Sequence, residues 1–319
     1  MKAAVRERYG PPDVVQISEV DRPTLGDDDV LVRVRAASLN RADWYTLKGP
    51  LIVRVTNGLR RPKTVLLGTD YAGTVEAVGA NVKQFRAGDD VFGGRTGSFA
   101  EYVSVPQDRA IAPKPANASF EEAAALPIAA ITALQGFRDK TQLRAGQKVL
   151  INGASGGVGT FGVQVAKALG AEVTAVCSTR NVESARSLGA DRVIDYTRED
   201  FTRSGQRYDV IFDVAGSRSW SNCRRVLAPD GVFVVVGAPS SHPLRHVAKM
   251  LLAGKLPGSQ KVVFFVAKIT QADLNALKEL VESGKVKSVI DRRYDLADIA
   301  DAYRYLGEGH AQGKVVVTV

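Results

Sequence analysis

The sequence predicts an α/β protein in which a β-rich region precedes a doubly wound parallel sheet. After residue 119, short apolar segments alternate with segments of helical periodicity. One of these apolar segments runs directly into a glycine-rich turn and then into an amphipathic helix. Near-continuous apolar runs of four to six residues are typical of strands buried on both faces, as in parallel sheets. Helices between such strands make a doubly wound domain.

The apolar segments place six strands in this domain. We expect them at residues 148–152, 173–177, 192–195, 209–214, 232–237 and 262–266. The first 115 residues instead show the alternation of half-buried strands, at residues 30–35, 72–78 and 100–105. Capping patterns begin helices after Ser119 and Thr270, and residues 314–319 form a final strand.

The composition excludes several classes of protein. The chain has 319 residues, 45% hydrophobic and 24% charged, which is near the globular average and predicts two domains. Two cysteines, Cys177 and Cys223, are too few for a disulfide scaffold or a four-cysteine zinc site, and they fit a reducing cytosol. No apolar run approaches the ~20 residues of a membrane-spanning helix, and the N-terminus lacks an apolar export signal. We therefore expect a cytoplasmic protein without a membrane partner.

The net charge of +9 is able to attract nucleic acid or an anionic surface. The basic residues are spread along the chain, however, with only short clusters such as Arg60-Arg61 and Arg224-Arg225. This distribution favours a solvated basic surface, with local attraction for a cofactor phosphate, over a nucleic-acid role.

The turn after residue 152 predicts a nucleotide-binding site. Ala154, Gly156 and Gly159 stand at the three glycine positions of the G-x-G-x-x-G pattern. Glycine permits a tight turn and lets the backbone approach a diphosphate, and the N-terminus of the following helix attracts that diphosphate. The alternative is a tight turn without a ligand. We expect cofactor contacts along the whole turn, at Gly153, Ala154, Ser155, Gly156, Gly157, Val158 and Gly159.

The end of the next strand favours NADPH over NADH. An acidic residue about 20 positions after the glycines holds the ribose hydroxyl of NADH and repels a 2′-phosphate. Ser178 lies 19 residues after Gly159 (178 − 159), and Thr179 and Arg180 follow it, with no carboxylate among them. Two hydroxyls and a guanidinium suit a phosphate. The alternative is that Thr179 or Asn181 caps the next helix and Arg180 is solvated.

Several short motifs at coherent spacing resemble those of the medium-chain dehydrogenase/reductase superfamily. The closest resemblance is to its zinc-free quinone oxidoreductase branch, including the reticulon-interacting-protein-like NADPH oxidoreductases. The matching segments are the glycine turn and residues 37–45, 67–75, 87–93, 187–191 and 309–315.

The resemblance implies two domains and a metal-free site. It places residues 1–118 and 257–319 in a GroES-like catalytic domain and residues 119–256 in a Rossmann domain, with nicotinamide and substrate in the cleft between them. Zinc-dependent relatives have a cysteine where this chain has Asn40, and a histidine–glutamate pair where it has Thr69 and Asp70. Too few ligands remain for zinc, and the structural-zinc loop is missing.

The implied reaction is hydride transfer from NADPH to a quinone or an α,β-unsaturated carbonyl. Asn40 and Tyr45 are the polar side chains that we expect to stabilise charge on the acceptor oxygen. Asn40 is equally well read as a turn residue, and Tyr45 as an aromatic packing residue. The resemblance adds further cofactor contacts at Thr132, Gly237, Phe264, Phe265 and Lys314. Plain core is an equal alternative for the two phenylalanines, and a surface salt bridge for Lys314.

Other interpretations stay open. Asp43 and Asp70 resemble a paired acid and base, although structural hydrogen bonding is favoured. His242 and His246 have metal-binding spacing, but Pro243 and the lack of a flanking carboxylate disfavour a metal. A metal-free alcohol or aldehyde oxidoreductase is the second enzymatic reading. An NADPH-binding protein with an RNA or protein partner is a third reading.

The expected assembly is a homodimer, because relatives commonly pair through the Rossmann sheet edge.

Overall fold

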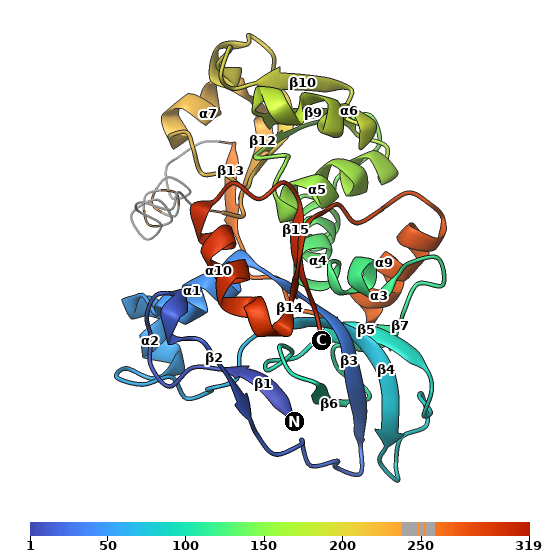
Figure 1. Cartoon of the computed structure of the whole chain (residues 1–319). Coiled ribbons are helices and arrows are strands. Elements are labelled where there is room, and N and C mark those ends of the chain that lie inside the picture. The colour runs from blue at the N-terminus through green and yellow to red at the C-terminus, as the bar shows by residue number, and fades with distance from the viewer. Residues whose placement is uncertain (238–247, 249, 251, 253–258) are drawn as a thin grey trace. The chain divides into compact units, whose positions relative to one another are not determined.

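The computed structural model describes residues 1–237, 248, 250, 252 and 259–319. The chain divides into two compact units (Figure 1). The β-rich unit contains Met1–Ala129, Lys268–Gly284 and Ser288–Val319, and the parallel-sheet unit contains Ala130–Ala267 and Lys285–Lys287. The predicted domain boundaries at 118/119 and 256/257 stay a prediction.

The parallel-sheet unit is built on a six-stranded sheet with the order β10-β9-β8-β11-β12-β13, in which all neighbouring strands are parallel. This is the classic doubly wound order, in which the strand sequence reverses beside the first strand. The strands are β8 (Lys148–Asn152), β9 (Glu172–Cys177), β10 (Arg192–Asp195), β11 (Tyr208–Asp213), β12 (Leu227–Val235) and β13 (Lys261–Phe264). The six predicted strands are therefore confirmed, with shifts at their ends.

Two shifts have a clear physical cause. β12 ends at Val235, before the predicted end, because the amides of Val236 and Gly237 both turn to donate to the carbonyl of Asp213, at 3.0 Å. The last strand, β13, lies at the sheet edge and is not buried on both faces, since Phe264 is 44% exposed. The prediction of burial on both faces is thus wrong for this strand.

Helices of the parallel-sheet unit connect its strands. α5 packs against β8 and β9, and α6 against β9 and β10 (Figure 1). The helices and short turns are α4 (Pro127–Gln135), η2 (Gly136–Lys140), α5 (Gly157–Ala168), η3 (Thr179–Asn181), α6 (Val182–Ser187), η4 (Phe201–Arg203) and α7 (Trp220–Val226). α4 begins in the β-rich unit, and its first residue is a proline, which needs no amide partner there.

The β-rich unit holds a seven-stranded sheet and a two-stranded sheet. The larger sheet has the order β14-β15-β3-β4-β5-β7, with β6 paired to β3, and the smaller sheet joins β1 to β2. The strands are β1 (Lys2–Val5), β2 (Gln16–Glu19), β3 (Asp29–Leu39), β4 (Asp70–Val78), β5 (Asp90–Gly94), β6 (Tyr102–Pro106), β7 (Ile111–Pro113), β14 (Ile290–Asp295) and β15 (Lys314–Thr318). β15 pairs antiparallel with β3, so the last strand of the chain lies beside residues 36–39 (Figure 1).

Helices of the β-rich unit begin at capping residues. Ser119 accepts from the amide of Glu122, and Thr270 accepts from the amide of Asp273, as the capping patterns predict. The elements are η1 (Pro12–Val14), α1 (Arg41–Lys48), α2 (Leu51–Asn57), α3 (Phe120–Ala124), α9 (Gln271–Glu282), η5 (Leu296–Asp298) and α10 (Ile299–Glu308).

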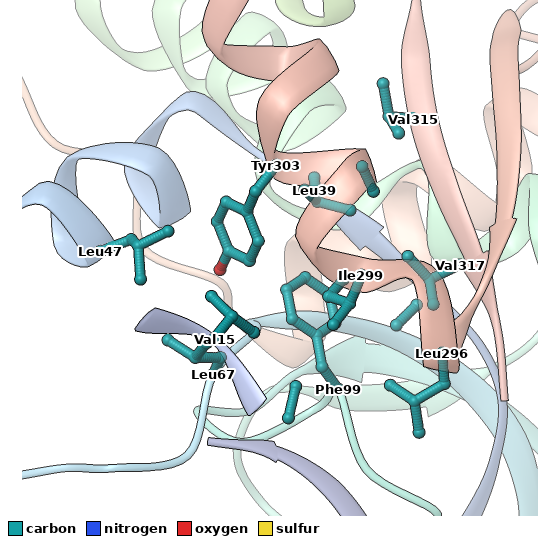
Figure 2. Packing of buried hydrophobic residues seen from close by; sticks show 13 residues of the cluster. Val15, Leu39, Leu47, Leu67, Phe99, Leu296, Ile299, Tyr303, Val315 and Val317 are labelled. Carbon is teal, nitrogen blue, oxygen red and sulfur yellow. The ribbon is translucent and has the colours of Figure 1, made fainter. Parts of the chain in front are cut away.

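One apolar core of this unit fixes α1 and α10 against the sheet. Tyr303 of α10 and Phe99 pack edge to face, with ring centroids 6.1 Å apart. Leu47 of α1, Leu39 of β3 and Val315 of β15 belong to the same buried cluster (Figure 2). This packing holds the first residues of α1 and β15 in place, and those residues carry the polar groups described below.

Candidate functional site

The glycine turn has the geometry that a diphosphate needs. β8 ends at Asn152, and Gly153 follows with φ at +90°, a conformation that favours glycine. The amides of Gly153 and Ala154 donate to the carbonyl of Val176, at 3.1 and 3.0 Å, which anchors the turn to β9. α5 then begins at Gly157 with Gly156 as its N-cap, and no side chain caps the helix. The first amides of α5 thus have no side-chain acceptor at the N-cap, and amides in this position are able to bind an anion.

Gly159 holds the helix close to the strand. A Cβ on Gly159 lies 2.1 Å from the carbonyl oxygen of Gly153, so only glycine fits there. A Cβ on Gly156 has only that oxygen within 4 Å, at 3.8 Å, which leaves its face of the turn open. The turn therefore fits a nicotinamide dinucleotide, as its sequence predicts. Ser155 and Val158 also belong to the turn, and both residues are half-buried.

Buried polar groups lie at the carboxyl ends of the neighbouring strands. The Asn152 amide donates to Oδ1 of Asp213, at 2.7 Å, and the amide of Gly216 donates to the same oxygen, at 2.9 Å. Burial raises the pKa of Asp213 to about 6, and these two hydrogen bonds oppose the rise. Gly237 follows β12, and a Cβ there lies 1.8 Å from the carbonyl oxygen of Val214. Sequence reasoning predicted Gly237 but missed Asp213, which reads as the last residue of an ordinary strand.

The segment expected to bind a 2′-phosphate contains an unexpected neighbour. Ser178 caps η3, and the Thr179 hydroxyl donates to Oδ2 of Asp195, at 2.5 Å. This hydrogen bond is the main cause of the lowered pKa of Asp195, so the carboxylate is ionised. Asp195 pairs with Cys177 in the β9–β10 register, and Arg198 lies 3.5 Å from its carboxylate. Arg180 is exposed beside this group.

The segment itself contains no carboxylate, but the register of the two strands brings the carboxylate of Asp195 to it. Asp195 comes from the adjacent strand, 16 residues after Thr179. The only available signal was the strand order, which brings the ends of β9 and β10 together.

Three other predicted cofactor contacts belong to the parallel-sheet unit. Thr132 is a half-buried residue in the middle of α4. Phe264 ends β13 and is 44% exposed, so the plain-core alternative is wrong for it. Phe265 is half-buried, and its ring lies 5.8 Å from Nζ of Lys140. Their contact with a cofactor stays a prediction.

The β-rich unit brings Asn40, Asp43, Asp70 and Lys314 into one buried group, called here the polar cluster. Lys314 Nζ donates to Oδ1 of Asn40, at 2.5 Å, and lies 3.5 Å from Oδ2 of Asp70. The Asn40 amide donates to the same Asp70 oxygen, at 2.8 Å. The alternative of a surface salt bridge for Lys314 is wrong, since its side chain is 2% exposed and that of Asp70 is fully buried. The Asn40 side chain bonds two charged residues, and Asn40 is also the N-cap residue of α1, in a capping box with Asp43.

Asp43 completes the polar cluster from the first turn of α1. Its Oδ2 accepts from the backbone N–H of Asn40, at 2.8 Å, and its Oδ1 accepts from the Thr69 hydroxyl, at 3.1 Å. Burial, and then the charge of Asp70, raise the pKa of Asp43 to about 6. Burial also raises the pKa of Asp70, and it lowers the pKa of Lys314, against the attraction of the two carboxylates. These contacts support the structural interpretation of both aspartates that the sequence favoured.

A cavity of about 180 Å³ in the β-rich unit reaches Asp43 and Thr69. Arg6 and the buried hydroxyl of Tyr303 also line it. Tyr45, from the next turn of α1, has a buried hydroxyl without a hydrogen-bond partner among the described residues. Burying an unpaired hydroxyl is costly, so this phenol stands out among the buried polar groups.

The residues at the positions of a catalytic zinc do not fit the metal. Zinc takes thiolate, imidazole and carboxylate ligands, whereas this site offers an amide, a hydroxyl and one carboxylate that is paired with the Lys314 cation. Within the described ranges, no group of three or more His, Cys, Asp and Glu side chains is placed to bind a metal. His242 and His246 lie outside the described residues.

Models of two protein families match parts of this chain. A model of the alcohol dehydrogenase GroES-like domain matches residues 26–116, and a model described as zinc-binding dehydrogenase matches residues 188–317.

The helices that the structure describes include none that is long and apolar enough to cross a membrane.

Curated relatives and solved structures match over nearly the whole chain. A 2-methylene-furan-3-one reductase of Solanum lycopersicum is 35% identical, over 99% of this chain and 79% of its own length. The NAD(P)H oxidoreductase RTN4IP1 of Mus musculus is 33% identical, over 100% of this chain and 89% of its own. The Escherichia coli quinone oxidoreductase in complex with NADPH superimposes with a TM-score of 0.85 and 27% identity, over the full length of both chains. The chain therefore belongs to the quinone oxidoreductase branch of the medium-chain dehydrogenase/reductase superfamily.

Proposed function

We propose that this protein is a zinc-independent oxidoreductase that reduces quinones or α,β-unsaturated carbonyls with NADPH. The observation that carries the proposal is the glycine turn, whose uncapped helix amides and open face fit a dinucleotide diphosphate. Relatives named for these acceptors support the substrate class: an NADPH-dependent alkenal/one oxidoreductase and a chloroplast envelope quinone oxidoreductase homolog, both of Arabidopsis thaliana and both 35% identical.

The cofactor, when bound, supplies a hydride from its nicotinamide. In the proposal, the turn from Gly153 to Gly159 binds the diphosphate, and Ser178, Thr179 and Arg180 bind the 2′-phosphate. Arg180 provides the positive charge, and Arg198 offsets the nearby carboxylate of Asp195. Thr132, Gly237, Phe264, Phe265 and Lys314 are the further proposed cofactor contacts.

Tyr45 and Asn40 are the residues that we assign to the acceptor. Hydride addition leaves negative charge on the acceptor oxygen, and a preorganised donor stabilises that charge. The buried Tyr45 hydroxyl is an unpaired donor. The Asn40 amide is held by Asp70 and Lys314, which fixes its orientation and leaves one of its two N–H groups for a ligand.

The assembly and compartment belong to the same proposal. A homodimer through β13 is supported by the place of this strand at the sheet edge and by Phe264 and Val266, which are 44% and 76% exposed. A reducing compartment, the cytoplasm, is supported by two cysteines that are both free and buried. Light scattering of the purified protein measures the first, and localisation of a tagged chain measures the second.

Turnover tests the central proposal. Purified protein should oxidise NADPH at 340 nm with a simple quinone or an enone such as an alkenal, and treatment with a strong chelator should leave the rate unchanged. An alcohol or aldehyde reductase would instead turn over saturated carbonyls, and an RNA- or protein-binding protein would bind NADPH without turnover. Binding without any turnover over a panel of both acceptor classes would overturn the assignment.

Arg180→Glu tests the choice of cofactor. We expect it to weaken NADPH binding about tenfold or more and NADH binding far less, because only NADPH carries the 2′-phosphate. Asp195→Asn should act in the opposite direction and strengthen NADPH binding, since it removes a negative charge beside Thr179. Calorimetric titration of both cofactors measures the ratio, and equal effects on the two cofactors would remove the NADPH assignment.

A further inference from the structure

Residues 48–65 of the β-rich unit expose several large apolar side chains together. Leu51 and Val55, one helical turn apart on α2, are 66% and 69% exposed. Leu59 and Val65, which follow the helix, are 61% and 45% exposed. Single exposed apolar residues are common on proteins, whereas these four lie within 15 residues of chain.

The same segment is positively charged throughout. From Trp44 to Thr69 the sequence contains five basic residues and no aspartate or glutamate: Lys48, Arg54, Arg60, Arg61 and Lys63. The side chain of Arg54 is held locally, since its Nε donates to the carbonyl of Gly49, at 2.6 Å. Arg60, Arg61 and Lys63 are exposed, and among the described residues no carboxylate forms an ion pair with them.

The turn after α2 has a defined shape that presents these groups. The Tyr9 hydroxyl donates to the carbonyls of Asn57 and Gly58, at 3.0 and 2.9 Å. The amide of Lys63 closes the turn by donating to the carbonyl of Asn57, at 2.7 Å. Gly58 has φ at +111°, and a Cβ there lies 2.1 Å from the carbonyl oxygen of Arg61, so the turn needs glycine. Leu59, Arg60 and Arg61 are therefore held on the outside of a closed turn.

We propose that residues 48–65 dock this protein onto an anionic lipid surface. Stable attachment to a bilayer interface generally needs two signals, and apolar side chains beside a cluster of basic residues supply both. A nucleic acid would use the basic residues but gains nothing from exposed leucine and valine. The absence of any acidic residue from the segment matches a uniformly negative surface better than a protein face of mixed charge.

This inference departs from the sequence-based prediction of no membrane partner. That prediction rests on the lack of a spanning helix, whereas docking at an interface needs none. The docking is independent of the proposed catalysis, because it uses neither the glycine turn nor the polar cluster. It would bring the enzyme to the phase in which apolar quinones and enones dissolve.

Vesicle flotation tests the proposal. The full-length protein should float with vesicles of phosphatidylcholine mixed with phosphatidylglycerol and should stay in solution with phosphatidylcholine alone, and salt should weaken its binding. Each basic residue near such a surface strengthens binding about fivefold, so Arg60→Glu with Arg61→Glu should lower the partition coefficient about 25-fold or more. Leu51→Ser, Val55→Ser and Leu59→Ser together should lower it about tenfold or more, with all charges retained.

A matched control comes from another exposed arginine pair, in the parallel-sheet unit. Arg224→Glu with Arg225→Glu makes the same charge change in the parallel-sheet unit, and it should leave flotation at the wild-type level. NADPH binding by each variant reports whether the chain is folded. Equal flotation with neutral and anionic vesicles overturns the proposal, as does wild-type flotation of the Arg60/Arg61 variant. Salt-sensitive binding to an RNA homopolymer that the serine variant retains, without vesicle binding, also overturns it and points to a general polyanion surface.

Discussion

The glycine turn and the polar cluster hold functional groups in opposite ways. The turn is one contiguous segment, 153–159, and it works through backbone amides that the protein leaves uncapped. The polar cluster is assembled from three distant segments and works through side chains that satisfy one another. The turn leaves backbone amides able to bind the negative charge of a ligand, whereas the polar cluster pairs its own charged side chains with one another.

The difference predicts different failures on mutation. A change in the turn should weaken the binding of a ligand and affect stability mainly where a new side chain collides with the backbone. A change in the polar cluster should leave an uncompensated charge inside the β-rich unit, which is costly because charges are poorly solvated there. Three experiments separate these two kinds of failure.

Lys314→Met should destabilise the β-rich unit by about 3–5 kcal/mol, since it breaks a buried ion pair and leaves Asp70 without its cation. Trp44 lies in this unit and Trp220 lies in the other, so Trp220→Phe gives a chain whose tryptophan fluorescence reports the β-rich unit alone. Urea unfolding of that chain, with and without the lysine change, measures the loss. Adding Asp70→Asn should recover much of it, and equal stability of Lys314→Met and the parent would contradict the assigned balance.

Gly159→Ala should weaken NADPH binding about 100-fold, because its Cβ meets the carbonyl oxygen of Gly153 at 2.1 Å and forces the helix away from the turn. Gly162→Ala, three residues later in α5, is the matched control, since its Cβ meets only side-chain atoms at 3.5 Å or more. Calorimetric titration compares the two. Normal binding by Gly159→Ala would show that the close approach of helix and strand is not needed.

The same contrast explains what the sequence could predict. The turn was predictable because its function depends on neighbours in sequence and on a strand-to-helix context that periodicity reveals. The six strands were predictable for the same reason, but the place of β13 at the sheet edge was not, because it is a property of the strand order. Phe264 consequently proves to be exposed rather than core.

The polar cluster could be predicted only in part. The sequence analysis identified all four residues of the cluster separately: Asn40, Asp43, Asp70 and Lys314. The sequence does not show that Lys314 contacts Asn40, which lies 274 residues earlier in the chain. Asp195 was missed for a similar reason, since it approaches Thr179 through the register of two adjacent strands. Local chemistry can be inferred from a single sequence, whereas the pairing of charges depends on tertiary contacts.

The third experiment uses pH to detect the balance in the polar cluster. The pKa of Asp43 is raised to about 6 in the folded chain, above its ordinary value of 3.8, so the folded state binds the proton more tightly. Stability from this group is therefore greatest when Asp43 is protonated, and it falls as pH rises from about 4 to about 6. Asp43→Asn removes this titration. The amide nitrogen of the new asparagine is able to donate to the Thr69 hydroxyl, while its side-chain oxygen accepts from the backbone N–H of Asn40.

We expect the stability of Asp43→Asn, relative to the parent with Trp220→Phe, to increase by about 1 kcal/mol or slightly more between about pH 5 and pH 7.5. Urea unfolding followed by Trp44 fluorescence measures the difference at each pH. Asp108→Asn, which removes an exposed carboxylate from the same unit, controls for the loss of one negative charge. If the stability of Asp43→Asn relative to the parent stays constant with pH, or decreases as pH rises, Asp43 is ionised throughout this range. Lys314 would then compensate the charges of both carboxylates rather than that of Asp70 alone.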